Sequence, residues 1–426
     1  MQVSKTKNIF GSFLGSVSEW YEFVVYGFCA PFLAPLFFPS ESKFISILAV
    51  FGAFASGFLV RPLGALIFGY FGDRYSRKKT MAIAVILIGL PTLVMGIIPT
   101  YHTIGVIAPI ILVITRLLQG ISVGGQFTGS AVFINEHMGE RNRYFGAGIT
   151  FTGAFIGMLL ASAVGAILTS MLNHQQLANW GWRIPFLLGI FVALLGYYLK
   201  SHTSEPTSFQ RLRANHKLSR NPILGAFKHE KINMLLSALV CWLTPIIVYQ
   251  LFIFMPTYAA SYLHLPLSEA LNINTVAMIT LSVFTLLLGA LADKIGYPIV
   301  MLTAAVAFMI LGFPLYHVLS IHPTALIWVQ LLFAVFGAGF IGPVMRVLSD
   351  IFAIKTRYTA LSFSYNMGFG IFGGTAALFN ILLIKKTMLI ASPGIYLSFT
   401  ALVSCLALIV IIIRGKQQDT SSNRLG

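Results

Sequence analysis

The sequence predicts an all-α polytopic membrane protein with twelve transmembrane helices in two bundles of six. Its 426 residues are 57% hydrophobic and only 9% charged, and the mean hydropathy is +0.85. A typical soluble domain carries about 25% charged residues. A membrane-spanning helix needs roughly 20 mostly apolar residues, so this composition is enough for about twelve spans. Apolar runs such as 107–114 and 401–413 do not alternate as barrel strands do. Composition therefore excludes a soluble enzyme, a disordered chain and a single-pass receptor.

Polar turns separate the candidate spans along the chain. The first six lie near residues 9–38, 44–71, 80–99, 104–135, 144–172 and 182–199. The second six lie near residues 232–263, 269–291, 297–319, 323–352, 357–384 and 388–413. The longest polar interruption, residues 200–231, divides these two sets. We therefore expect an N-terminal bundle at 1–199, a cytoplasmic linker at 200–231 and a C-terminal bundle with a short cytoplasmic tail at 232–426.

The basic residues are distributed unevenly between the two sides that these spans define. With both termini on one side, 21 of the 28 Lys and Arg residues fall on that side. Only four fall on the other side, namely Lys43, Arg183, Lys385 and Lys386. Because basic residues favour the cytoplasmic side, we expect both termini in the cytoplasm. The net charge of +16 is then a signal of topology, and we expect no nucleic-acid partner.

The two sets of spans carry matching landmarks. Asp73 follows the second span, and Asp293 follows the eighth, 220 residues later. A second pair of landmarks, each an acid seven residues before an arginine, recurs 214 residues apart: Glu136 with Arg143, then Asp350 with Arg357. Such internal repeats are typical of secondary transporters, whose substrate site lies at the repeat interface. We interpret the chain as a duplicated transporter with its substrate site between the halves.

Several of these motifs resemble signatures of the major facilitator superfamily. Gly69-x-x-x-Asp73-Arg74-x-x-Arg77-Lys78 resembles the family's signature between spans 2 and 3. Leu118-x-Gly120-Ile121-x-x-Gly124, with Glu136 and Arg143, resembles its signature of spans 4 and 5. Features similar to its metabolite:H⁺ symporter branch are residues 15–27, Arg61-Pro62-Leu63-Gly64, residues 116–120 and 181–186, and Arg357-Tyr358 with Tyr365-Asn366. That branch includes carriers of proline and betaine, α-ketoglutarate, citrate and shikimate. The resemblance, from about residue 10 to 380, implies a proton-coupled importer of a small polar metabolite in a bacterial inner membrane.

Two carboxylates in the first span are candidates for proton coupling. Glu19 lies about 15 Å along a helix that begins near residue 9, at the middle of a ~30 Å core. Glu22 is one turn further, and Tyr26 continues the same stripe. Charged residues at this depth are costly and default to functional hypotheses. Two carboxylates so close rarely both stay ionised in a low dielectric, so one can carry a proton. Permanent pairing with Arg61 or Arg116 is the structural alternative.

The fourth span carries a second polar stripe, with Arg116, Gln119 and Gln126 on one face. The planar guanidinium of Arg116 suits a bidentate contact with a substrate carboxylate, although a structural salt bridge is the alternative. From the second half, Tyr249 and Asn366 are candidates to complete the site, with packing as their alternative role. Two deep acids and two deep arginines balance, which favours a zwitterion such as proline or betaine slightly over an organic acid.

Charged residues at the predicted cytoplasmic ends form a third group. They lie too shallow for a site at the membrane midplane, so we expect a gating relay that locks the outward-facing state and breaks during transport. The alternative is a topology anchor combined with a helix cap. The residues are Asp73, Arg74, Arg77, Glu136, Arg143, Asp350 and Arg357.

The remaining sequence features argue for a transporter without a cofactor. No phosphate-binding glycine loop is present, which leaves ATP drive unsupported, and no catalytic or metal-binding constellation stands out. We therefore expect no enzyme activity, no metal and no cofactor, and a monomer whose partners are a small molecule, protons and the lipid bilayer. Gln126 stands where relatives usually carry Glu, so an uncoupled uniporter or a proton antiporter is the nearest alternative. A membrane sensor without transport and an intramembrane enzyme are remoter.

Overall fold

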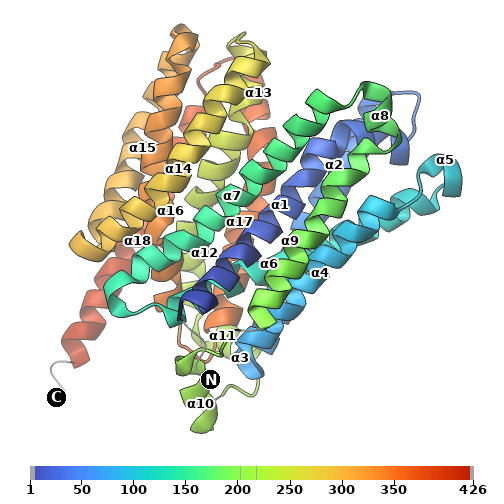
Figure 1. The fold of residues 1–426 in the computed structure, drawn as a ribbon. Helices are drawn as coiled ribbons and strands as arrows, with labels where there is room; N and C mark the ends of the chain where they lie inside the picture. The colour runs from blue at the N-terminus through green and yellow to red at the C-terminus, as the bar shows by residue number, and fades with distance from the viewer. Residues whose placement is uncertain (1–4, 202, 217, 423–426) are drawn as a thin grey trace. The chain divides into compact units, whose positions relative to one another are not determined.

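The computed structural model describes residues 5–201, 203–216 and 218–422, and these described residues form helices and turns without strands (Figure 1). Eleven helices are long and apolar enough to cross a membrane, and the bent pair Thr6–Gly27 and Cys29–Phe37 supplies a twelfth span. Large apolar side chains such as Leu59 and Trp328 are 81% and 70% exposed, which suits contact with lipid and not with water. The chain is a multi-pass helical membrane protein, as its composition predicts.

The chain folds into two compact units, and each unit contains a segment from the other half of the sequence. The first unit comprises Met1–His137, Thr152–Ala226 and Ile354–Phe363. The second comprises Met138–Phe151, Phe227–Ala353 and Ser364–Gly426. The division near residue 226 falls within the long polar interruption of the sequence. The short segments 138–151 and 354–363 contain the starts of α7 and α17, so these two helices each contribute to both units.

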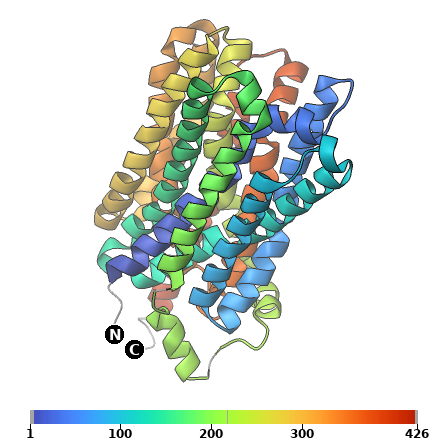
Figure 2. The same ribbon diagram turned by 45° about the vertical axis from the view of Figure 1, so that its right-hand side comes forward.

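The first unit is built on α1, α4, α6 and α9, which pack against one another (Figure 2). Its helices are α1 Lys5–Phe37, α2 Lys43–Leu59, α3 Arg61–Arg74, α4 Arg77–Ile97, α5 Tyr101–Ile104, α6 Ile107–His137, most of α7 Arg143–Met171, α8 His174–Asn179, α9 Ile184–Ser201 and α10 Thr207–Ala214. α1 bends by 57° around residue 28, ahead of two prolines within the helix, Pro31 and Pro35. The second span is broken at Val60, and α3 begins at Arg61 with Pro62, which has no backbone N–H to donate, in its first turn.

Backbone contact between α2–α3 and α6 fixes the centre of the first unit. A Cβ atom on Gly120 would lie 2.0 Å from the carbonyl oxygen of Gly57, and one on Gly124 would lie 2.1 Å from that of Arg61. No side chain fits at either position, so glycine is required for this close approach. Close packing sets the register between Arg61 on α3 and Arg116 on α6.

The second unit is built on α12, α14, α15, α16, α18 and most of α17. Its helices are α12 Lys231–Pro245, the π-helix η3 Ile246–Ile253, α13 Met255–Tyr262, α14 Leu267–Ile295, α15 Tyr297–Ile321, α16 Leu326–Asp350, α17 Arg357–Thr387 and α18 Pro393–Ser422, with α11 Pro222–His229 at the division. The last span begins at Pro393 and not near residue 388. Residues 388–391 are apolar but precede the helix in a turn, with Met388 at φ 55°, so hydropathy alone placed the start too early.

Candidate functional site

A buried carboxylate lies in the core of the first unit. Glu22 on α1 has no exposed surface, and both of its oxygens accept hydroxyl hydrogen bonds. Ser18 Oγ donates to Oε1 at 3.1 Å, and Thr92 Oγ1 on α4 donates to Oε2 at 2.5 Å. Among the described residues, no basic side chain lies within salt-bridge distance of Glu22. The permanent ion pair considered as an alternative for this acid is therefore absent from the described residues.

Arg116 on α6 is buried beside this carboxylate but does not contact it. The guanidinium carbon lies 3.7 Å from the ring centroid of Tyr26, a cation–π geometry. Nη1 donates to Gln119 Oε1, and Nη2 donates to the Phe23 carbonyl at 3.4 Å. No carboxylate of the described residues lies within 4 Å of Arg116. A buried guanidinium held only by neutral groups can accept a carboxylate from outside the protein.

Gln119 and Thr92 connect the acid to the guanidinium. Gln119 Nε2 donates to Thr92 Oγ1 at 2.6 Å, while its Oε1 accepts from Arg116. Glu22, Thr92, Gln119 and Arg116 therefore form one continuous chain of hydrogen bonds, and each is at most 2% exposed. The structure thus joins four predicted residues, Glu22, Tyr26, Arg116 and Gln119, and adds Thr92. Sequence reasoning missed Thr92, whose hydroxyl inside an otherwise apolar span was the available signal.

The other predicted residues of the first unit lie elsewhere in its core. Gln126 Nε2 donates to the Gly15 carbonyl at 2.8 Å and ties α6 to α1, whereas its buried Oε1 has no hydrogen-bond partner among the described residues. Glu19 is 1% exposed. The guanidinium carbon of Arg61 lies 4.6 Å and 4.7 Å from the ring centroids of Phe58 and Phe23.

The candidates from the second half belong to the second unit and lie in its core. Tyr249 sits in the π-helix, 8% exposed, with its ring 5.7 Å from that of Phe369. Asn366 on α17 is 2% exposed. The adjacent Gln250 donates to the Pro393 carbonyl at 2.7 Å, which anchors the π-helix to the start of α18.

An ion-pair cluster in the first unit gathers several of the residues assigned to gating. The Asp73 carboxylate accepts the backbone N–H of Thr359 at 2.8 Å and that of Tyr358 at 3.2 Å. It also lies 3.4 Å from Arg77, whose guanidinium pairs with Glu136. Arg357 lies 3.4 Å from the same Glu136. Asp73 is therefore the cap of the α17 N-terminus, and Glu136 is shared by two arginines.

The second unit contains the counterpart of this cap. Asp293 at the end of α14 accepts the backbone N–H groups of Tyr144 and Phe145, each at 2.9 Å, and so caps the start of α7. Charged residues also lie near this cap. Asp350 pairs with Arg346 at 2.7 Å, and Arg143 lies over the Tyr144 ring at 4.8 Å. Asp350 and Arg143 therefore both lie near the start of α7, which Asp293 caps.

Glu205, after the sixth span, was not predicted and joins the same region of the first unit. Its carboxylate accepts from Ser76 Oγ at 2.6 Å and from the Arg77 backbone N–H at 2.8 Å, so it caps the N-terminus of α4. Arg74 turns away from the Asp73 cluster. It donates to the Tyr70 hydroxyl and to the Arg220 carbonyl, the latter at 2.7 Å.

A comparison with known proteins identifies the family. The model of the Major Facilitator Superfamily matches residues 9–378, which is most of the chain. The chain belongs to the major facilitator superfamily. It is 32% identical over 431 residues to the proline/betaine transporter of Escherichia coli strain K12, covering 98% of this chain and 84% of that protein.

Two further proteins extend the comparison. The chain is 28% identical over 402 residues to the citrate-proton symporter of Salmonella typhi, covering 94% of this chain and 92% of that protein. The fold is similar to that of the proton:xylose symporter XylE bound to 6-bromo-6-deoxy-D-glucose. That likeness has a TM-score of 0.80 at 17% identity and covers 95% of this chain and 94% of the other. The relatives are transporters, and the predicted fold class and family resemblance are confirmed.

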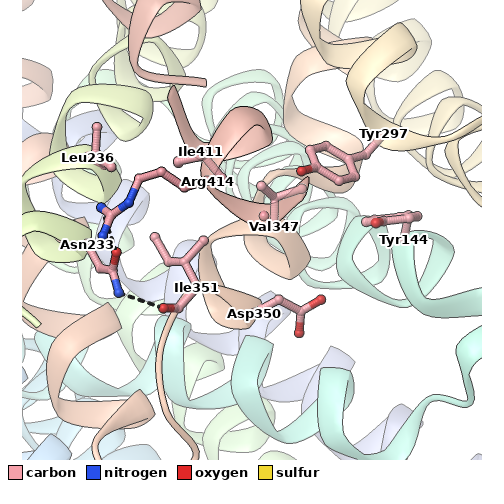
Figure 3. Close-up of a pocket in the computed structure, with 10 residues that line it drawn as sticks. Tyr144, Asn233, Leu236, Tyr297, Val347, Asp350, Ile351, Ile411 and Arg414 are labelled. Atoms are coloured by element: carbon pink, nitrogen blue, oxygen red, sulfur yellow. Dashed lines mark hydrogen bonds between the residues drawn. The ribbon is translucent and has the colours of Figure 1, made fainter. Parts of the chain in front are cut away.

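This superfamily chain also holds a cavity of about 180 Å³ in its second unit (Figure 3). Three of its polar side chains have partners within the protein. Asn233 Nδ2 donates to the Ile351 carbonyl at 2.9 Å, and Arg414 lies 3.4 Å from Asn233 Oδ1. Asp350 at its edge pairs with Arg346. Because Asn233, Arg414 and Asp350 already have these partners, the cavity is a weaker candidate site than the network around Arg116. The described residues also contain no cluster of His, Cys, Asp or Glu that could hold a metal ion.

Proposed function

We propose that this protein is a proton-coupled symporter that imports a small polar metabolite by alternating access. The similarity to proline/betaine transporters and to a citrate-proton symporter over nearly the whole chain supports the substrate class and the coupling ion. The observation that carries the proposal is the pair formed by Arg116 and Glu22. A buried cation without a carboxylate partner among the described residues lies one hydrogen-bonded chain away from a buried acid without a basic partner.

In this mechanism the substrate carboxylate binds Arg116 and a proton binds Glu22. Burial makes the neutral form of an acid and a paired form of a guanidinium energetically favourable. Proton and substrate together therefore remove both uncompensated charges, and the loaded carrier can reorient. The Tyr26 ring packs against the guanidinium. We propose Glu19, Gln126, Tyr249 and Asn366 as further contributors to proton or substrate binding.

The capping clusters are proposed as the gate. Reorientation then requires Asp73 to release the start of α17 and Asp293 to release the start of α7. The ion pairs of Glu136 with Arg77 and Arg357 act with the first cap, and Arg74, Arg143 and Asp350 lie beside the caps. Each contact is local and reversible, as a two-state switch requires.

The cellular setting is part of the same proposal. The excess of Lys and Arg on one side supports cytoplasmic termini, and the bacterial relatives support a location in the inner membrane. We propose a monomer in the lipid bilayer. A small zwitterion such as proline or betaine is the first choice of substrate, and an organic acid is the second, because both present a carboxylate to Arg116.

Uptake into proteoliposomes tests this function. Labelled proline, betaine, α-ketoglutarate and citrate would each be offered with an inward proton gradient, with and without a protonophore. We expect accumulation of one solute class that the protonophore abolishes. Downhill exchange without accumulation would instead support an uncoupled uniporter. That second candidate is favoured by Gln126, because its amide replaces a titratable side chain and bonds the Gly15 carbonyl.

A further inference from the structure

Thr92 occupies the junction of the buried hydrogen-bond chain. Its hydroxyl oxygen has one proton to donate and two lone pairs to accept with. Three polar atoms surround it: Glu22 Oε2 at 2.5 Å, Gln119 Nε2 at 2.6 Å and the Ile88 carbonyl at 2.9 Å. Gln119 Nε2 can only donate, so its bond uses one lone pair. The single hydroxyl proton can then be donated either to the Glu22 carboxylate or to the Ile88 carbonyl, but not to both.

The protonation state of Glu22 decides that choice. When Glu22 is ionised it is the stronger acceptor, so Thr92 donates to it. When Glu22 carries a proton, it can donate that proton to the free lone pair of Thr92. The Thr92 hydroxyl then turns to the Ile88 carbonyl, which lies one helical turn earlier on α4. In both states the Thr92 hydroxyl donates one hydrogen bond and accepts from Gln119, while the Ile88 carbonyl keeps the backbone hydrogen bond of its own helix. The rotation therefore leaves no buried polar group unpaired at Thr92.

This rotation of the Thr92 hydroxyl changes how firmly Gln119 is held beside Arg116. A hydroxyl that donates to an anion is a better acceptor, so ionised Glu22 strengthens the bond from Gln119. That bond keeps Gln119 Oε1 turned toward the guanidinium. Protonation of Glu22 weakens the anchor, which frees the amide to leave Arg116 and admits a carboxylate in its place.

We propose that Thr92 is the positioning residue that couples protonation of Glu22 to substrate binding at Arg116. This inference rests on the proposed symport function and assigns the route by which its two ligands communicate. Protonation at Glu22 raises the affinity of Arg116 for the substrate carboxylate, and by linkage bound substrate favours the protonated acid. The sign is that of symport, because each ligand promotes binding of the other.

Few other charged or titratable groups face this junction. Tyr21 on α1 interacts electrostatically with Glu22, and its hydroxyl donates to the Pro185 carbonyl at 3.0 Å. α6 presents Arg116 behind Gln119. α9 presents Gly189, where a Cβ atom would lie 3.3 Å from Glu22 Cγ and 3.1 Å from Thr92 Cγ2. The methyl group of Thr92 therefore packs on α9, while its hydroxyl forms the relay, the hydrogen-bonded link from Glu22 through Thr92 and Gln119 to Arg116.

This division of roles provides a matched pair of variants. Thr92→Val keeps a methyl group toward α9 and removes the hydroxyl, whereas Thr92→Ser keeps the hydroxyl and removes the methyl group. Thr115→Val is the control, because Thr115 is also buried in the same unit but donates only to the Leu112 carbonyl of its own helix, at 2.8 Å. Melting in detergent would show that all three variants are folded.

The experiment measures KM for labelled proline and citrate as a function of external pH, together with protonophore-sensitive accumulation. We expect the wild-type protein, Thr92→Ser and Thr115→Val to bind more tightly as the external pH falls. Thr92→Val should lose this pH dependence and roughly tenfold or more of its accumulation, while downhill exchange persists. Proton-driven accumulation whose pH dependence survives in Thr92→Val overturns the relay alone. A wild-type protein that shows no proton-driven accumulation overturns the proposed function and the relay with it.

Discussion

The carboxylate of Asp73 accepts the backbone N–H of Thr359 at 2.8 Å, although the two residues are 286 positions apart in the chain. An acid at the end of the second span therefore caps the first turn of α17, where the helix dipole favours a negative charge. In the second unit, Asp293 accepts the backbone N–H of Tyr144 at 2.9 Å in the same manner. The duplicated landmarks of the sequence thus correspond to a duplicated contact, in which each acid caps a helix from the other half.

Removal of the Asp73 cap should destabilise the first unit. Asp73→Ala leaves the backbone N–H groups of Tyr358 and Thr359 without their acceptor, at a cost of about 1–3 kcal/mol. Asp73→Asn keeps one acceptor and should fall between Ala and the wild type. Thermal melting in detergent measures the effect, with exposed Glu41→Ala as the control. Equal melting temperatures for all four proteins would contradict the capping role.

Neutralisation of Glu22 should separate transport from its driving force. In Glu22→Gln the side chain still bonds Ser18 or Thr92 but cannot take up a proton, so protonophore-sensitive accumulation should disappear while exchange of labelled for unlabelled solute continues. Uptake and counterflow in proteoliposomes distinguish the two activities. Glu269→Gln, at an exposed acid in the first turn of α14, is the control. Gradient-driven uptake retained in a Glu19→Gln/Glu22→Gln double variant would rule out this pair as proton carriers.

Replacement of Arg116 should weaken substrate binding more than it weakens the fold. Arg116→Lys keeps the charge but loses the planar fork that binds a carboxylate through two hydrogen bonds. A lost hydrogen bond to a charged group costs about 1.5–3 kcal/mol, so KM should rise roughly tenfold or more. Initial rates of uptake give this value. Arg414→Lys, at the edge of the cavity in Figure 3, should leave KM unchanged. The same KM in both variants would exclude Arg116 as the carboxylate ligand.

Even a methyl side chain added at the contact between α2 and α6 should destabilise the protein. A Cβ atom on Gly120 would lie 2.0 Å from the Gly57 carbonyl oxygen, so Gly120→Ala must push the two helices apart. Overpacking of this kind costs about 1–3 kcal/mol. Gly52→Ala is the matched control on α2, because nothing lies within 4 Å of its added Cβ. We expect a lower melting temperature and lower yield for Gly120→Ala alone, and similar behaviour of both variants would be the contrary result.

The membrane spans could be predicted from the sequence because apolar runs of sufficient length have few other uses. Their ends were less certain where apolar residues continue into a turn, as at Met388. Within one helix, spacing placed Arg116 and Gln119 together correctly, since residues three apart share a helix face. The closeness of Tyr26 to Arg116 needed the packing of α1 on α6, which periodicity in either helix does not supply.

Other contacts were beyond sequence reasoning for a physical reason. Thr92 contributes through one hydroxyl on a helix whose facing partners only the fold determines. The partners of Asp73 and Glu205 are backbone N–H groups, which every residue except proline carries and which leave no trace in the sequence. The gating interpretation counted charges and therefore expected ion pairs. The alternative interpretation named a helix cap, and the structure identifies the helix starts that Asp73 and Asp293 cap.

The exchange of short segments between the two units also has a consequence for biosynthesis. Ile354–Phe363 belongs to the first unit, yet it leaves the ribosome long after Ala226. At about 5–20 residues per second, the delay is on the order of ten seconds. Throughout that interval the nascent N-terminal half lacks the helix start that Asp73 caps. The first unit is thus synthesised first but cannot be completed until residues 354–363 have been made. A chain that ended at the linker would leave Asp73 without the helix start that it caps.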